Sequence, residues 1–531
     1  MSTPQEEWSL RALLDAAGVR AVIHHADAPL PEAPGDPGEE GRQGNSTDPR
    51  VTSLQFDSRR VQPGSLYLAM PGQSTHGARF AQGAVEQGAV GVLTDAAGLK
   101  IVGDVRVPVV VVEEPRVAMA ALAVAFHHQP SSRVPMFAVT GTNGKTTTMF
   151  LLDAALSALG LKVGTLGTIG FRLGGEALEW QTSTVTTPEA PDLQELFDQM
   201  IGRGAMAVAM EVSSHALALH RADGTRFRVA GFTMLGRDHL DFHRTMEDYF
   251  CAKARLFTSD LSEQVVVNAD SDWGRRLVGM VRESQPGKPI TTVGRHPSAD
   301  VRIVHDVLTS DGLGRHVGLE VAGERVDFIL SMPGDHNVEN AALALAMVRA
   351  AGLDLRVASR GLAHAQVPGR MQQVDLGPGA PTVVVDFAHT PQAVEEAIEA
   401  VVVPGRTITV IGAGGDRDRE KRPLMGAAAG RGSDIVVVTD DNPRTEDPAA
   451  IRAAVTEGVS TTNAELLEIP GRRQAIREAL QRAGADDVVL VLGKGHERGQ
   501  IVGAQVLDFD DVEVAREQWA SLQRESEGSA R

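Results

Sequence analysis

Short apolar runs alternate along this chain with longer segments in which apolar residues recur every three or four positions. Runs of about four to eight residues are typical of buried strands, and the longer periodic segments are typical of helices. We predict strands at 65–70, 89–94, 107–112, 136–140, 205–210, 231–235, 264–267, 382–385, 407–411, 435–439 and 488–492. We predict helices at 9–17, 78–88, 146–159 and 338–351. Strands that alternate with helices indicate βαβ units, so the predicted fold class is α/β with mostly parallel sheets.

Breaks in this pattern divide the chain. Its 531 residues suggest about three domains. Residues 26–50 are rich in Pro, Gly, Asp and Glu and lack the apolar side chains that offset ordering entropy, so we predict a mobile insertion there. Residues 129–134 resemble a linker, and Pro368-Gly369 marks a second boundary. The predicted domains are 1–132, 133–366 and 367–531.

Composition excludes several classes of protein. The 51 basic and 69 acidic residues give a net charge of −18, which argues against a nucleic-acid partner. The single cysteine, Cys251, excludes an internal disulfide and a cysteine-built metal cluster. The first ten residues lack the apolar core of a signal peptide, and the apolar runs are too short to span a membrane. We therefore expect a cytoplasmic protein.

A glycine-rich segment between the strand 136–140 and the helix 146–159 is the strongest local motif. Such a loop exposes backbone N–H groups beside a helix N-terminus and binds phosphates, which predicts an ATP site. Lys145 would contact the β- and γ-phosphates, and the Thr146 hydroxyl could bind Mg²⁺. The strict P-loop pattern has glycine where Val139 stands, so a purely structural turn is the alternative. The candidate ATP-binding residues are Gly141, Thr142, Asn143, Gly144, Lys145, Thr146 and Thr147.

Two polar motifs follow neighbouring strands of the same unit. Glu211 begins E-V-S-S-H, and His239 lies in D-H-L-D-F-H at 238–243. Ligands of open α/β sheets bind beyond the carboxyl ends of the strands, so both motifs could meet the glycine loop and hold Mg²⁺ on phosphate oxygens. By itself D-H-x-D-x-H favours a surface turn, but beside a phosphate-binding loop a metal site is the better interpretation.

The third unit carries four more polar motifs at predicted strand ends, where solvated turns are the alternative. They are D-F-A-H at 386–389, G-G-D-R-D-R at 414–419, D-D-N-P-R at 440–444 and G-K-G-H-E at 493–497.

Together these motifs, with T-T-P-E at 186–189 and P-G-R-M at 368–371, resemble the Mur ligase family in identity and order. Within it they are similar to the MurE type, which adds the third residue of the peptidoglycan stem peptide. The resemblance implies an N-terminal domain for UDP-MurNAc, a central ATPase domain and a C-terminal Rossmann-like domain that binds the amino acid. It implies an ATP-dependent ligase that joins meso-diaminopimelate to the D-Glu of UDP-MurNAc-L-Ala-D-Glu through an acyl phosphate.

The resemblance also implies roles for single residues. The uridine nucleotide would contact Ser58, Gln73, Ser74 and Thr75. The muramoyl-dipeptide would contact Thr186, Thr187, Ser213 and Arg221. Arg370, Asp386 and His389 would close over ATP. The pocket for diaminopimelate would contain Arg417, Asp441, Asn442, Pro443, Arg444, Gly493 and Glu497. The catalytic residues would be Lys145, Lys253, His239, Arg370 and His389, and the Mg²⁺ ligands Thr146, Glu211, His239 and Lys253.

Lys253 matches the family's lysine that reacts with CO₂ to form a carbamate, which turns a cation into a carboxylate able to help bind Mg²⁺. By itself it would be a solvated helix lysine. The chain departs from the family at Met234, where Asn is usual, and at His76, Leu219, His336 and Glu339.

Two alternatives remain open. The ligase could use L-lysine or LL-diaminopimelate, or the chain could be a weakly active nucleotide-binding regulatory paralogue, which Met234 favours. The expected partners are small-molecule substrates, with no nucleic acid and no membrane span, and the expected state is a monomer.

Overall fold

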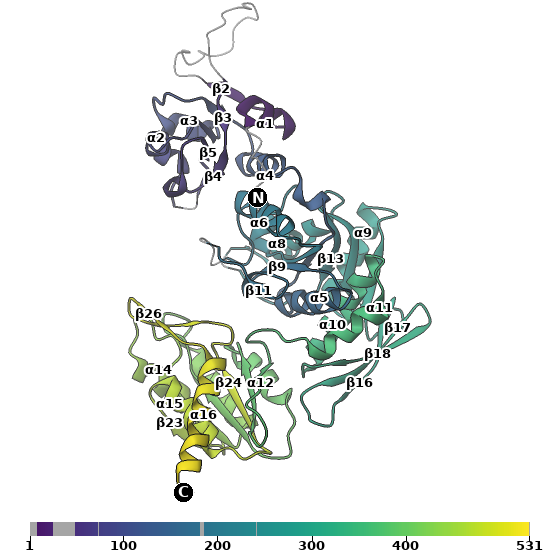
Figure 1. The fold of residues 1–531 in the computed structure, drawn as a ribbon, viewed down its shortest axis with the longest axis vertical. Helices are drawn as coiled ribbons and strands as arrows, with labels where there is room; N and C mark the ends of the chain where they lie inside the picture. The colour runs from purple at the N-terminus through teal and green to yellow at the C-terminus, as the bar shows by residue number, and fades with distance from the viewer. Residues whose placement is uncertain (1–7, 25–47, 73, 181–184, 241, 530–531) are drawn as a thin grey trace, which may run out of the picture.

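The computed structural model describes residues 8–24, 48–72, 74–180, 185–240 and 242–529. Most of the predicted insertion at 26–50, together with Gln73, lies outside the described residues. The described chain forms three α/β domains arranged in a row, with the N-terminal domain at one end and the C-terminal domain at the other (Figure 1).

The N-terminal domain is built on a five-stranded sheet with the order β2-β7-β6-β5-β4, in which only β2 runs antiparallel to its neighbour. A separate antiparallel pair joins β1 to β3. Its strands are β1 (Trp8–Ser9), β2 (Val22–His24), β3 (Arg50–Val51), β4 (Ser53–Gln55), β5 (Ser65–Leu68), β6 (Gly91–Thr94) and β7 (Val109–Val111). Its helices are α1 (Leu10–Ala16), η1 (Ser58–Arg60), η2 (Gly77–Phe80), α2 (Ala81–Glu86), α3 (Ala96–Val102), α4 (Pro115–Phe126) and η3 (Pro130–Ser132).

The central domain contains an 11-stranded sheet with the order β11-β10-β9-β12-β8-β13-β14-β15-β16-β17-β18, parallel from β9 to β16 and antiparallel at both ends. Its strands are β8 (Met136–Thr140), β9 (Val163–Gly167), β10 (Gly170–Leu173), β11 (Glu176–Ala177), β12 (Ala207–Glu211), β13 (Phe227–Phe232), β14 (Ser262–Asn268), β15 (Ile290–Gly294), β16 (Val301–Leu308), β17 (Arg315–Val321) and β18 (Glu324–Leu330). Its helices are α5 (Lys145–Ala158), α6 (Ala190–Gly202), α7 (Ser214–Ala218), α8 (Met246–Ala254), η4 (Arg255–Phe257), α9 (Asp272–Ser284), α10 (Asp335–Ala350), α11 (Leu355–Arg360) and η5 (Gly361–His364).

Strand β8 lies in the middle of this sheet and is buried on both faces. Phe137 and Val139 point into the core beneath α5 and α10, whereas Met136 and Ala138 point into the core on the other face. This two-residue alternation is the ordinary geometry of a strand, and burial on both faces explains why the sequence reads as a continuous apolar run.

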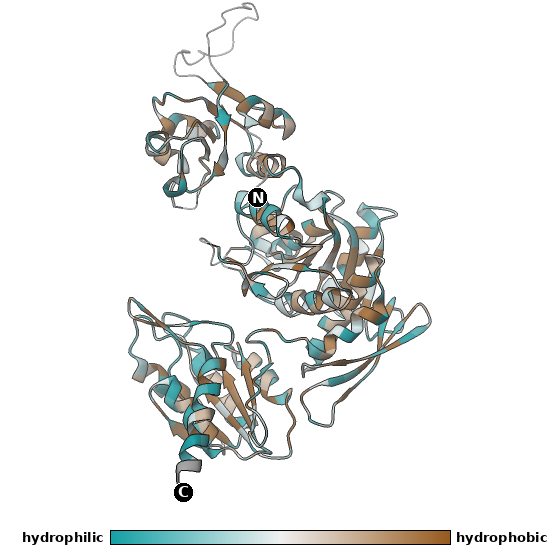
Figure 2. Cartoon of the chain, viewed as in Figure 1, coloured by the Kyte–Doolittle hydropathy of each residue, from teal (hydrophilic) through white to brown (hydrophobic). Residues whose placement is uncertain are grey.

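The C-terminal domain contains a six-stranded sheet with the order β19-β20-β24-β21-β22-β23, parallel except for β19. The brown, apolar strands lie between helices whose outer faces are teal (Figure 2). Its strands are β19 (Gln372–Gln373), β20 (Thr382–Asp386), β21 (Thr407–Ile411), β22 (Ile435–Val438), β23 (Glu465–Glu468), β24 (Val488–Leu492), β25 (Gly499–Val502) and β26 (Gln505–Asp508), the last two forming a hairpin. Its helices are α12 (Pro391–Glu399), α13 (Lys421–Gly432), α14 (Pro448–Val459), α15 (Arg472–Arg482) and α16 (Asp511–Ser529).

The structure confirms the predicted strands at 136–140, 407–411 and 488–492 and corrects two other expectations. The strand predicted at 231–235 is β13, which ends at Phe232 because the next two residues bond to the glycine loop. The segment 129–134, predicted as a linker, lies between α4 and β8 and contains η3, and its buried Ser131 hydroxyl accepts a hydrogen bond from the Arg226 N–H at 3.1 Å. The helix predicted at 78–88 is divided into η2 and α2. None of the described helices is long and apolar enough to cross a bilayer.

Candidate active site

Strand register brings three predicted motifs together at one edge of the central sheet. Strand β8 lies between β12 and β13, with Val139 opposite Glu211 and Thr140 opposite Phe232. The glycine loop that follows β8 therefore emerges between the Glu211 carboxyl group and the loop that follows β13. Because β12 and β13 lie on opposite sides of β8, this is a switch point, where open α/β sheets bind ligands.

The glycine loop is tightly enclosed by its neighbours. The Thr142 N–H donates to the Met234 carbonyl at 2.8 Å, and the Thr233 hydroxyl donates to the Asn143 carbonyl at 2.6 Å. A Cβ at Gly141 would overlap the Thr233 hydroxyl, and Gly144 has a φ of +83°, which favours glycine. The loop thus leads into the N-terminus of α5 in the arrangement expected of a phosphate site. Thr146 and Thr147 follow in the first turn of α5, both buried.

Two lysines converge on this loop. Lys145 Nζ donates to the carbonyl oxygens of Gly141 (3.0 Å) and Thr142 (2.8 Å), and Lys253 Nζ donates to the Gly141 carbonyl at 2.7 Å. Lys253 is 1% exposed and its Nζ lies 4.6 Å from the centre of the Tyr249 ring. Burial, with the nearby charge of Lys145, holds the pKa of Lys253 well below its ordinary value. Lys253 is therefore not the solvated lysine that its helix alone would suggest.

The Glu211 carboxylate is fully buried beside the glycine loop. It accepts hydrogen bonds from the Thr168 N–H (2.9 Å) and hydroxyl (3.1 Å). The described residues contain no group of three or more His, Cys, Asp or Glu side chains arranged to hold a metal ion. Mg²⁺ in nucleotide sites is held by one or two protein oxygens together with phosphate oxygens, so a carboxylate and the Thr146 hydroxyl beside a phosphate loop fit that ion.

His239 lies on the loop after β13, which is packed by other histidines. Its ring centre is 4.9 Å from that of His215 and 6.0 Å from that of Tyr249. The buried His243 ring hydrogen-bonds the Ser214 hydroxyl at 2.9 Å, and burial followed by the charges of His215 and His239 lowers the pKa of His243. His215 and His243 lay within predicted motifs without a role, and the structure shows that they attach this loop to α7.

The residues predicted to hold the dipeptide lie beside Glu211. The Thr187 hydroxyl donates to the Glu211 carbonyl (3.0 Å) and accepts from the Ser213 N–H (3.2 Å). The Thr186 hydroxyl lies 3.2 Å from that of Thr168. Arg221 donates to the Thr187 carbonyl (3.0 Å). These predicted residues are brought together.

Ion pairs join the central domain to the N-terminal domain, and the sequence did not predict them. Glu189 accepts hydrogen bonds from Arg221 at 3.0 Å and from Arg116, on α4, at 3.1 Å. A second pair joins Arg60 to Asp192 at 2.9 Å. Glu189 stands in the T-T-P-E motif, so the sequence marked this residue, but its contact with Arg116 depends on how the two domains pack.

In the N-terminal domain, Ser58 begins η1, whose N-cap is Asp57. Burial, with the charge of Asp57, raises the pKa of the adjacent Tyr67 to about 12. Ser74 and Thr75 are exposed in a loop of the N-terminal domain that is closed by a bridge between Pro71 and His76. His76, which differs from the usual residue of the family, has a structural role here. Its Nδ1 accepts a hydrogen bond from the Ala78 N–H at 3.1 Å and so caps η2.

Three residues predicted to close over ATP lie near the start of the C-terminal domain. The Arg370 guanidinium lies 4.7 Å from the Phe387 ring centre. Burial, with a smaller contribution from the charge of Arg370, lowers the pKa of Lys145. The buried Asp386 carboxylate accepts from the Met371 N–H at 2.7 Å, and burial raises its pKa. His389 is exposed, with Nδ1 2.8 Å from the Phe387 carbonyl oxygen. These three residues surround Phe387.

The motifs predicted to bind the amino acid follow three adjacent strands, β24, β21 and β22. Asn442 Nδ2 donates to Glu497 Oε2 at 2.7 Å, and a Cβ at Gly493 would lie 3.3 Å from Asp441 Oδ2. Arg444 donates to the Gly415 carbonyl at 2.6 Å. The guanidinium of Arg444 and the stem of the exposed Arg417 flank Gly414, and Pro443 is buried against Gly415. The structure brings these predicted residues together, and they include two acids and two arginines.

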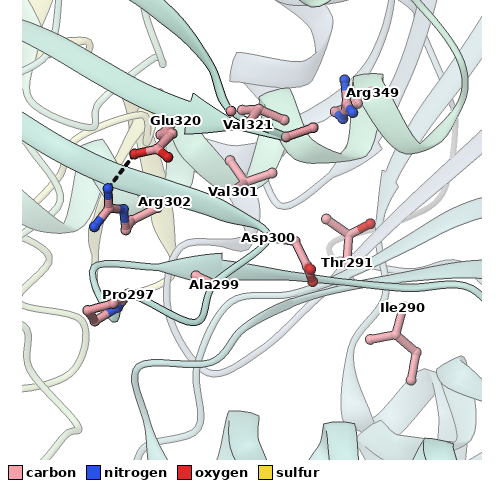
Figure 3. Close-up of a pocket in the computed structure, with 12 residues that line it drawn as sticks. Ile290, Thr291, Pro297, Ala299, Asp300, Val301, Arg302, Glu320, Val321 and Arg349 are labelled. Atoms are coloured by element: carbon pink, nitrogen blue, oxygen red, sulfur yellow. Dashed lines mark hydrogen bonds and ion pairs between the residues drawn. The ribbon is translucent and has the colours of Figure 1, made fainter.

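A pocket of about 600 Å³ lies elsewhere, between the starts of β15 and β16, the β17–β18 turn and the end of α10 (Figure 3). Its polar side chains include Asp300, Arg349 and the ion pair Arg302–Glu320. It contains none of the predicted site residues, so the candidate active site is not this pocket.

Three known domain families match successive parts of the chain: "Mur ligase family, catalytic domain" at 50–127, "Mur ligase middle domain" at 139–348 and "Mur ligase, glutamate ligase domain" at 369–495. The chain is similar to UDP-N-acetylmuramoyl-L-alanyl-D-glutamate–2,6-diaminopimelate ligases. That of Streptomyces avermitilis is 43% identical, covering 93% of this chain and 97% of the relative, and that of Corynebacterium glutamicum is 42% identical, covering 88% and 91%. A solved structure of a ligase with the same name superposes with a TM-score of 0.67 at 30% identity, covering 91% of this chain and 98% of that chain.

Proposed function

The chain belongs to the Mur ligase family, and from that premise we propose that it is an ATP-dependent ligase that joins 2,6-diaminopimelate to the D-glutamate of UDP-MurNAc-L-Ala-D-Glu. The observation that carries this proposal is the presence of two polar sites at the carboxyl ends of two parallel sheets. The central sheet offers a phosphate loop beside Glu211, and the C-terminal sheet offers arginines and carboxylates suited to an amino acid. The meso isomer is the form we propose.

The glycine loop would bind the phosphates of ATP, with Lys145 leaving its two carbonyl partners to contact the β- and γ-phosphates. The γ-carboxylate of D-glutamate attacks the γ-phosphorus in line, the bond to the β-phosphate oxygen breaks, and ADP leaves. The product is an acyl phosphate. Lys145 would stabilise the negative charge that develops on the transferred group.

The donor set beside the loop fits Mg²⁺, with Thr146 and Glu211 as protein ligands and His239 and a carbamate on Lys253 as the further candidates. When bound, the ion would neutralise phosphate charge. The Arg370 guanidinium and the Asp386 carboxylate would approach the nucleotide from the C-terminal domain, with His389 beside them.

Lys253 has the properties that a carbamate requires. Only the neutral amine reacts with CO₂, and the lowered pKa of Lys253 favours that form. Carbamylation of that neutral amine would release a proton and place beside Lys145 an anion that can pair with its ammonium group. This is a physical reason to expect the modification at this position rather than at an exposed lysine.

The C-terminal site would receive the amino acid. Arg444 would bind the distal carboxylate through paired hydrogen bonds, with Arg417 nearby, and the carboxylates of Asp441 and Glu497 would attract the distal ammonium group. The other amine attacks the acyl carbon, a C–N bond forms, the C–O bond to phosphate breaks, and the proton of the amine is lost. Closing the C-terminal domain over the central domain would exclude water, which otherwise hydrolyses the acyl phosphate.

Release of ADP tests this proposal when the amino acid is varied. The purified chain is given ATP, Mg²⁺ and UDP-MurNAc-L-Ala-D-Glu, and meso-diaminopimelate, LL-diaminopimelate or L-lysine is added in turn. We expect ADP release that depends on the meso isomer and is much slower with the other two. Preference for lysine would overturn the substrate assignment, and release independent of any amino acid would favour the regulatory alternative.

A further inference from the structure

The C-terminal domain contains a buried lysine to which the proposed mechanism gives no task. Lys494 follows β24 and its side chain is fully buried. A buried ammonium group requires partners, because the cost of removing it from water is several kcal/mol. The positions of those partners indicate what the lysine holds.

Four groups surround Lys494 Nζ. It donates to Asn442 Oδ1 at 3.2 Å and to the Gly499 carbonyl at 2.5 Å. The carboxylate oxygens of Asp441 and Glu497 lie 3.6 Å and 3.5 Å away. Three of these four partners are side chains that we propose to contact the incoming amino acid.

The same lysine attaches the β25–β26 hairpin to the site through Gly499. The hairpin is also fastened to the loop 441–444, since the Ile501 N–H donates to Asn442 Oδ1 (2.9 Å) and the Arg444 N–H donates to the Ile501 carbonyl (3.0 Å). The Gly503 N–H donates to the Arg444 carbonyl at 2.7 Å. The backbone of Arg444 has a φ of +53°, which a non-glycine residue adopts only when its surroundings impose it.

The carboxylates of Asp441 and Glu497 both lie beside Lys494, and the nearby Arg472 is paired with Asp511. Asp441 Oδ1 is buried without a hydrogen-bond partner among the described residues. One carboxylate oxygen therefore remains to accept a hydrogen bond from a ligand such as an ammonium group.

We propose that Lys494 is the positioning residue of the amino-acid site. Its ammonium group fixes Asp441, Asn442 and Glu497 and anchors the hairpin that holds the backbone of Arg444, while leaving an oxygen of Asp441 for the substrate ammonium. Lys494 itself does not touch the substrate. This inference rests on the proposed function and gives a task to Lys494, a residue of the motif G-K-G-H-E to which the sequence assigned no role.

The substitution Lys494→Met tests the role because Met has a similar length without charge. Binding groups that lose their support shift by an ångström or less, which is enough to cost about tenfold or more. We expect the KM for diaminopimelate to rise about tenfold or more, while the KM values for ATP and UDP-MurNAc-dipeptide stay within about twofold. Arg406→Met is the matched control, since Arg406 pairs with the buried Asp487 at the opposite end of the same sheet.

The control should lower the thermal unfolding midpoint without changing the KM for diaminopimelate. If Lys494→Met does not fold, Lys494→Arg is the variant that tests the role, because it keeps the charge but alters its position. We expect the same selective rise in the KM for diaminopimelate. An unchanged KM, or equal changes for all three substrates, would overturn the role of Lys494. Failure of the proposed function would look different, because the wild-type protein would then show no diaminopimelate-dependent release of ADP.

Discussion

Lys145 and Lys253 donate hydrogen bonds to the same acceptor, the carbonyl oxygen of Gly141, at 3.0 Å and 2.7 Å. One lysine begins α5 and the other lies near the end of α8. Burial, followed by the charge of Lys145, holds the pKa of Lys253 well below its ordinary value. This pair connects the phosphate loop to the chemistry proposed for Lys253.

Replacing Lys145 with Ala should abolish ligation without unfolding the protein. The variant removes the cation proposed for the γ-phosphate, and loss of one such electrostatic contact costs about a hundredfold or more in kcat. Lys162→Ala, which removes an exposed lysine bonded to the Arg203 carbonyl, is the control and should keep wild-type turnover. Near wild-type turnover in a folded Lys145→Ala protein would show that the loop does not bind the reacting phosphate.

Lys253→Ala should lose most activity and regain part of it when a short carboxylate such as acetate is added, because the added anion can replace the carbamate. Lys288→Ala is the control, since the pKa of Lys288 is also lowered by burial, to about 8, but its partners lie outside the site. Mass spectrometry of the native protein in bicarbonate should show one added CO₂ in the wild type and none in Lys253→Ala. Full activity without Lys253 would contradict the carbamate.

Met234→Asn should preserve or raise turnover. The backbone carbonyl of Met234 already accepts the Thr142 N–H, and this contact survives the substitution. A thioether accepts hydrogen bonds weakly and cannot donate, so an amide adds polar capacity that Met lacks. A steep fall in kcat would mean that the site has been rebuilt around the Met side chain.

Arg444→Ala should reduce kcat/KM for diaminopimelate far more than for lysine. Diaminopimelate has a carboxylate where lysine has none, and loss of its guanidinium partner costs a few kcal/mol, or about a hundredfold. Arg431→Ala, which removes an exposed arginine paired with Glu395, controls for the loss of positive charge from the domain. Equal losses with both amino acids would remove Arg444 from the specificity pocket.

His496→Phe should make the protein less sensitive to acid. Burial, with the charge of Arg370, lowers the pKa of His496 to about 4, whereas an unfolded His titrates near 6.5. Between these values the unfolded chain binds more protons, so stability falls as the pH falls. The loss attributable to His496 is on the order of 2 kcal/mol between about pH 7 and about pH 5.

Thermal unfolding midpoints at both pH values check this prediction. Phe keeps a ring that can pack on Phe387, whose centre lies 5.0 Å from that of His496. The midpoint of the variant should fall less than that of the wild type between the two pH values. Parallel falls would show that His496 is not a source of acid sensitivity.

The sequence predicted the parts of the site that are local. The glycine loop and Glu211 follow buried apolar strands, and register alone then places them side by side. Contacts between distant segments could not be predicted: Lys253 reaches Gly141 across 112 residues, and Lys494 is buried by a hairpin that follows it. Neither contact is encoded in a nearby pattern of residue types.

The strands at the antiparallel ends of the central sheet were not predicted, for a different reason. Strand β18 alternates between buried and exposed residues over most of its length, and the predicted strands were chosen as continuous apolar runs. Half-buried strands show alternation instead, so this signal was present in the sequence. The ion pair of Glu189 with Arg116, in contrast, depends on how two domains pack.

Isotopic labelling of the substrate carboxylate tests the central claim most directly. UDP-MurNAc-L-Ala-D-Glu whose γ-carboxylate carries the heavy oxygen isotope is incubated with the chain, ATP, Mg²⁺ and meso-diaminopimelate, and phosphate and product are analysed by mass spectrometry. Activation as an acyl phosphate transfers one labelled oxygen to phosphate for each diaminopimelate joined. We expect singly labelled phosphate in equal amount to the tripeptide product. Unlabelled phosphate, or ADP formed without that product, would contradict the proposed ligase.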